Sequence, residues 1–67
     1  MKYEIYQELL FIPDSRFENT QRVMVVGLRK HGSAKLSNGW LVDADGIAEG
    51  TGRIPGGHVE EVPKIPG

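Results

Sequence analysis

The side chain with the clearest capacity for recognition is Trp40, the single tryptophan of the chain. It follows Asn38-Gly39, a dipeptide typical of tight turns, so we expect it at the start of a strand beside a loop. There the flat indole face could receive a prolyl ridge or a nucleic-acid base. The alternative is that Trp40 covers a small core, to which one large aromatic side chain contributes strongly. The residue type alone favours the core interpretation, and the position favours recognition.

A basic cluster precedes Trp40 and consists of Arg29, Lys30 and Lys35, with His31 beside them. Cationic groups next to an aromatic side chain are the ingredients of single-strand nucleic-acid binding. The whole chain has a formal net charge of −1, from 8 Lys and Arg against 9 Asp and Glu. Such binding would therefore depend on this local patch and would be weak and sensitive to salt. A solvated loop is the alternative interpretation.

The sequence contains no strong motif for catalysis or for metal binding. The histidines, His31 and His58, have no spacing typical of metal ligands, so we predict no metal site. His58 stands near Glu60 and could titrate near neutral pH, which would tune binding. The chain has no cysteine, and its serines lie in no nucleophile motif, so we predict neither an enzyme nor a cofactor. Asp43-Ala44-Asp45-Gly46 is interpreted as a reverse turn.

The elements that must position these residues are short strands. Nine glycines and four prolines in 67 residues leave little room for helices. The glycines of His31-Gly32, Asn38-Gly39 and Asp45-Gly46 indicate tight turns. We predict an all-β fold with a single small barrel domain over residues 1–62 and a flexible C-terminal tail over residues 63–67. Five strands are expected, over residues 2–7, 22–28, 40–42, 50–54 and 58–62, with residues 8–21 as a long connection.

The second half of the chain resembles a Src-homology-3 (SH3) type barrel. Gly39-Trp40 stands where that family opens its third strand, and residues 52–60 (GRIPGGHVE) match its Gly-x-hydrophobic-Pro stretch before the last strand. His58 stands where the family has a tyrosine. Ile5-Tyr6 can be laid on the aromatic motif of its first strand. The resemblance implies a small five-stranded antiparallel barrel, SH3-like.

In such a barrel Trp40, Pro55 and His58 would share a face, and Tyr6 would add a third aromatic wall. A plain turn permitted by two glycines is the alternative for the Pro55 segment. The groove interpretation leads to our main expectation of function. The chain would be a non-enzymatic protein-interaction module, or a subunit of a larger assembly, that binds a protein partner through an aromatic and proline groove.

Two other functions remain open from the sequence. A nucleic-acid-binding accessory or regulatory protein of phage or bacterial type would use Arg29, Lys30 and Lys35. A structural homo-oligomer would complete an insufficient core with apolar residues from 10–12 and Phe17. The longest apolar run, residues 9–12, is too short to span a bilayer, so we expect no membrane partner and a cytoplasmic location.

Overall fold

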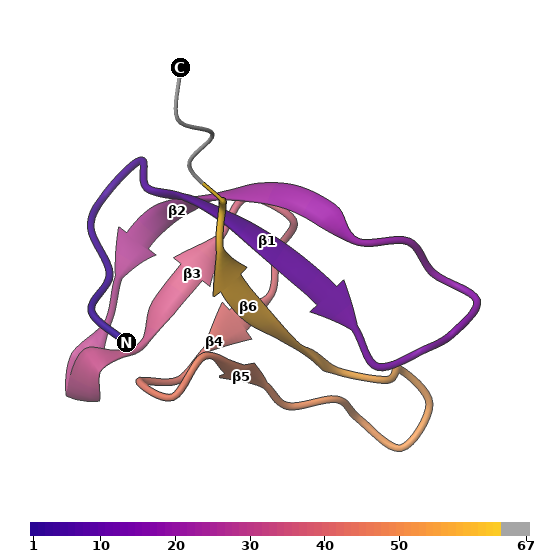
Figure 1. Cartoon of the computed structure of the whole chain (residues 1–67). Coiled ribbons are helices and arrows are strands. Elements are labelled where there is room, and N and C mark those ends of the chain that lie inside the picture. The colour runs from indigo at the N-terminus through magenta and orange to yellow at the C-terminus, as the bar shows by residue number, and fades with distance from the viewer. Residues whose placement is uncertain (64–67) are drawn as a thin grey trace.

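Six antiparallel strands form a nearly closed all-β barrel in the computed structural model, which describes residues 1–63 (Figure 1). In chain order the elements are β1 (Glu8–Pro13), β2 (Gln21–Leu28), a short 3-10 turn η1 (Lys30–Gly32), β3 (Ala34–Leu36), β4 (Leu41–Val42), β5 (Ile47–Ala48) and β6 (Gly57–Glu61). The strand order in the sheet is β4-β3-β2-β1-β6-β5. The all-β barrel prediction is confirmed, with one strand more than expected.

Alternation of side chains along the central strands builds the core. In β1, Leu9 and Phe11 are buried, and Leu9 lies opposite Val23 of β2 while Phe11 lies opposite Val59 of β6. Successive side chains of a strand point to opposite faces, so one face of β1 is apolar and lies inside. The other buried apolar residues of the core are Tyr3, Val25, Ala34, Leu36, Val42 and Ala48.

The strand predicted over residues 2–7 is wrong. Tyr6 has a φ of 66°, and the Gln7 N–H donates to the Glu4 carbonyl, so this segment is a turn. The Gln7 side chain closes the turn by accepting the Glu4 N–H at 2.9 Å. The first strand is therefore β1, and the prediction of residues 8–21 as one long connection is wrong over Glu8–Pro13.

The strand predicted over residues 50–54 is also wrong. Thr51 and Ile54 are joined by a backbone hydrogen bond, and the Thr51 hydroxyl accepts the Ile54 N–H at 3.2 Å. These bonds fold the segment into a loop. The neighbouring strand is β5, and a further short strand, β3, was not predicted.

Several local predictions are confirmed. The strands over residues 22–28, 40–42 and 58–62 correspond to β2, β4 and β6 within one residue at each end. The three Xaa-Gly turns have positive φ at Gly32, Gly39 and Gly46, as tight turns require. The part of the chain that the structure describes contains no helix long and apolar enough to cross a membrane. The predicted flexible tail falls, from residue 64 onward, outside the described residues.

The N-terminal segment is attached to the turn after β4. Tyr3 is buried, and its hydroxyl donates to the Asp43 carbonyl oxygen. Burial raises the pKa of Tyr3 above 10.0, and the charges of Asp43 and Asp45 raise it further, while a hydrogen bond with the Gly46 backbone lowers it in part. The neutral phenol is therefore the form that the folded protein favours.

This preference predicts a loss of stability at alkaline pH. Because the pKa of Tyr3 is higher in the folded chain than in the unfolded chain, the stabilisation is complete below about pH 10 and is lost as the pH rises through the folded-state pKa. The free energy of unfolding, measured with urea across this range, should fall less steeply in Tyr3→Phe than in the wild type. Parallel declines in the two proteins would contradict the prediction.

Candidate functional site

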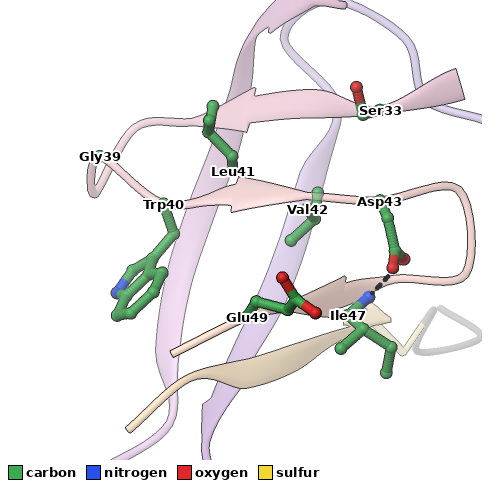
Figure 2. A pocket seen from close by; sticks show the side chains of 8 residues that line it. All are labelled: Ser33, Gly39, Trp40, Leu41, Val42, Asp43, Ile47 and Glu49. Carbon is green, nitrogen blue, oxygen red and sulfur yellow. Dashed lines mark hydrogen bonds between the residues drawn. The ribbon is translucent and has the colours of Figure 1, made fainter. Parts of the chain in front are cut away.

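The barrel has an open seam between its two edge strands, β4 and β5. The turn over residues 43–46 joins them, and one backbone hydrogen bond, from the Asp43 N–H to the Ile47 carbonyl at 3.0 Å, holds them together at that end. In the described residues β4 and β5 form no ladder beyond this bond, and the two segments diverge from it (Figure 2). The sheet therefore stops short of full closure.

Local sequence explains why the strands meet at one end only. The Asp43 carboxylate accepts the N–H groups of Asp45 and Ile47, at 2.9 and 3.0 Å, which fixes the turn. Further along, β5 is held against β6, with Ala48 opposite Gly57. The chain then leaves in the loop over residues 49–56, so no second pair of residues joins β5 to β4.

A hollow of about 480 Å³ lies along this seam, and we call it the seam groove. Leu41 and Ile47 line this hollow, and each keeps 46% of its surface exposed. Figure 2 shows the side chains at the seam. The lining residues are Ser33, Gly39, Trp40, Leu41, Val42, Asp43, Ile47 and Glu49.

Trp40 packs against the core, as one interpretation of the sequence predicted, and it also lies at the seam groove. It is half-buried and stacks on Phe11, with ring centroids 5.8 Å apart and planes 19° apart. Its backbone N–H donates to the Asn38 side chain at 3.1 Å, in the turn that precedes β4. The indole therefore packs against the core, and it also forms one wall of the seam groove.

Two carboxylates lie at the seam groove, and they differ in what they already bind. Asp43 is engaged by two backbone N–H groups of its own turn. Glu49 is exposed, and the ion pairs found among residues 1–63, Arg22–Glu8 and His58–Glu60, do not include it. Glu49 is therefore the carboxylate with capacity for an external cation.

Of the four residues predicted to form one groove, only Trp40 lines the seam groove. His58 lies between Ile12 of β1 and Ile47 of β5, so it is next to the groove residue Ile47 without lining the groove itself. There the His58 imidazole lies 3.6 Å from the Glu60 carboxylate. Pro55 is exposed in the loop before β6, and Tyr6 is 73% exposed in the turn before β1.

Two of the three basic residues lie away from Trp40. Arg29 and Lys30 are exposed where β2 leads into η1, near the start of β3, whereas Trp40 pairs with the end of β3. Lys35 is exposed on β3, opposite Leu41, the residue that follows Trp40. The described structure therefore separates Arg29 and Lys30 from the aromatic side chain and leaves Lys35 near it.

Sequence reasoning did not find Leu41, Ile47 and Glu49. Leu41 had one available signal, its position next to Trp40. Glu49 and Ile47 had none, because they belong to the seam groove only through the sheet order. Residues that line a groove between two edge strands can be identified only when the order of the strands in the sheet is known.

The chain matches no protein-family model, no curated protein sequence and no solved structure. Within residues 1–63, no three His, Asp or Glu side chains are grouped so that they could hold a metal ion. The seam groove is therefore the feature from which a function can be inferred.

Proposed function

We propose that this chain is a small non-enzymatic protein-interaction module that binds an extended segment of a protein partner in the seam groove. The observation that carries the proposal is the open hollow between two edge strands, lined by Trp40 and by the exposed side chains of Leu41 and Ile47. Covering these side chains removes apolar surface from water, at about 25 cal/mol for each Å² buried. An extended segment has the shape that fits a seam between strands.

The rigidity of Trp40 supports the same function. Tryptophan is among the residues that contribute most to binding energy at protein interfaces. The indole stacks on Phe11, and the backbone N–H of Trp40 donates to the Asn38 side chain, so the residue is held in place before any partner arrives. A wall that is already ordered loses little conformational entropy on binding, which leaves more of the contact energy as affinity.

As part of this proposal, we describe the barrel as SH3-like in the broad sense. Gly39-Trp40 directly precedes β4 and the Pro55 loop precedes the last strand, β6, which supports the resemblance, whereas the strand expected at residues 50–54 is a loop. The proposed contact surface differs from the one that the resemblance implied, since it includes Leu41 and Ile47 in place of Pro55, His58 and Tyr6.

The test is a selection of random heptapeptides displayed on phage against the wild-type protein, with binding of the enriched peptides measured by Trp40 fluorescence. The double variant Leu41→Ser/Ile47→Ser should weaken binding of these peptides about tenfold or more, because two apolar contacts are lost. Both side chains are half-exposed, so the variant should remain folded.

The matched control is Val26→Ser/Leu28→Ser, which removes two apolar side chains of similar exposure, 46% and 56%, from β2. Neither residue lines the seam groove. Enriched peptides should bind this control as they bind the wild type. Absence of enrichment, or equal losses in both double variants, would contradict the proposed function.

A further inference from the structure

The hydrogen-bonding directions of β4 leave one residue unpaired at the seam. The Leu36 N–H donates to the Trp40 carbonyl at 2.8 Å, and Val42 pairs with Ala34, so Trp40 and Val42 direct their backbone groups toward β3. Backbone groups alternate in direction along an antiparallel strand, so those of Leu41 point away from β3.

The backbone N–H of Asp43, two residues after Leu41, shows which strand lies on the side away from β3. This N–H also points away from β3, and it donates to the Ile47 carbonyl across the seam. Leu41 has no corresponding partner in the described structure, because β4 and β5 form no ladder at its level. One N–H and one carbonyl of β4 are therefore free at the wall of the seam groove, and such groups form hydrogen bonds with an added strand.

The charge at the same place is negative. Glu49 lies at the seam groove, is exposed, and has no ion-pair partner among residues 1–63. Asp43 adds a second carboxylate at the far end of the groove. Among residues 1–63 no Lys or Arg side chain lines the groove itself, and the nearest cation along the sheet, Lys35, lies outside it on β3 opposite Leu41. A cationic side chain on a bound segment would be attracted here and an acidic one repelled.

We propose that the seam groove takes its partner segment as an added β-strand beside β4, and that this segment carries a lysine or arginine flanked by apolar residues. The inference rests on the proposed function and specifies its ligand. The backbone of the segment bonds to the free N–H and carbonyl of Leu41. Its apolar side chains contact Trp40 and Ile47, and its cation contacts Glu49.

The first test uses the heptapeptides enriched by the wild-type protein. We expect them to contain lysine or arginine next to apolar residues. Glu49→Gln should weaken their binding up to about fivefold, as for an exposed ion pair, and Glu49→Lys about tenfold or more at low salt. Replacing the peptide's cation by glutamate should restore binding to Glu49→Lys. The control Glu18→Lys makes the same change of charge on an exposed loop residue outside the groove and should bind as the wild type does.

The second test uses the same peptides with single backbone N-methyl groups. The Leu41 carbonyl can accept from one amide of an added strand, so methylation of that amide should weaken binding about tenfold and methylation of the amides on either side of it should have little effect. Enriched peptides without a cation, or peptides in which no single amide is sensitive to methylation, would overturn this inference. The proposed function would still stand if those peptides required Leu41 and Ile47. Peptides that bind independently of both residues, or no enrichment at all, would overturn both.

Discussion

Replacing Gly56 by alanine is expected to unfold most of the protein in water. Gly56 is buried at the base of the loop over residues 49–56. A methyl group there would overlap the carbonyl oxygen of Ala48 and would lie 2.5 Å from the backbone nitrogen of Gly50. Both are main-chain atoms, so no side-chain rotation can relieve the overlap. Relief requires the loop base to separate from β5.

The expected loss follows from the small size of the domain. A domain of 67 residues without disulfides rarely has a free energy of unfolding above about 3–5 kcal/mol. Overpacking in a core typically costs about 1–3 kcal/mol, and a forced movement of backbone should cost at least the upper value. Far-ultraviolet dichroism and urea denaturation of Gly56→Ala should therefore show a largely unfolded chain.

Gly52→Ala is the matched control for this substitution. Gly52 lies in the same loop, and a methyl group there would meet no atom within 4 Å. Its free energy of unfolding should stay within about 0.5 kcal/mol of the wild type, or rise slightly because alanine restricts the unfolded chain. Equal stability of Gly56→Ala and Gly52→Ala would refute the close approach of Ala48, Gly50 and Gly56.

Phe11→Ala is expected to have the second-largest effect. Phe11 is 1% exposed, and it is the largest of the fully buried side chains. Removing a buried aromatic ring and leaving a cavity costs about 3–5 kcal/mol, which is much of the stability that so small a domain can have. The substitution also removes the ring on which Trp40 stacks. In the fraction that remains folded, the emission of Trp40 should shift to longer wavelength.

Phe17→Ala makes the same chemical change at a surface position. Phe17 is 86% exposed, and its main contact is with Arg16, whose guanidinium carbon lies 5.3 Å from the ring centroid. The cost should be less than about 1 kcal/mol, with no change in Trp40 emission. Urea denaturation of both variants compares the free energy that a buried phenylalanine contributes with that of an exposed one. Equal costs would show that Phe11 does not occupy the core.

The contact between Phe11 and Trp40 contributes both to the stability of the barrel and to the proposed binding site. Phe11 supports Trp40 from inside the barrel, and Trp40 forms a wall of the seam groove on the outside. A loss of packing at Phe11 should therefore loosen the groove even where the barrel stays folded. Leu41 and Ile47, which line the seam groove, can be replaced without removing the contact between Phe11 and Trp40.

The local sequence determined the all-β class, the three Xaa-Gly turns, and strands β2, β4 and β6. These features depend on neighbouring residues alone: β-branched runs favour extended backbone, and glycine permits positive φ. The Asn38-Gly39 turn also placed Trp40 beside a strand start, and it lies directly before β4. Each of these inferences needs only a few consecutive residues.

The tertiary structure decided which of several possible strands formed. Residues 2–7 carry apolar side chains at alternate positions and residues 9–12 are continuously apolar, so both segments could form a strand; pairing of Leu9 with Val23 and of Phe11 with Val59 selected the second segment. For a related reason, Pro55, His58 and Tyr6 do not line the hollow that Trp40 lines. Once Phe11 and Val59 face inward, period two turns His58 to the opposite side of the sheet.

The seam groove itself is a consequence of strand order, which no short stretch of sequence encodes. Leu41, Ile47 and Glu49 lie together because β4 and β5 are the two ends of one curled sheet that meets at Asp43 and Ile47. Pairing between strands distant in sequence is set by burial of the whole core. The residues thus determined that strands would form, and packing of the complete chain determined which edges would remain free.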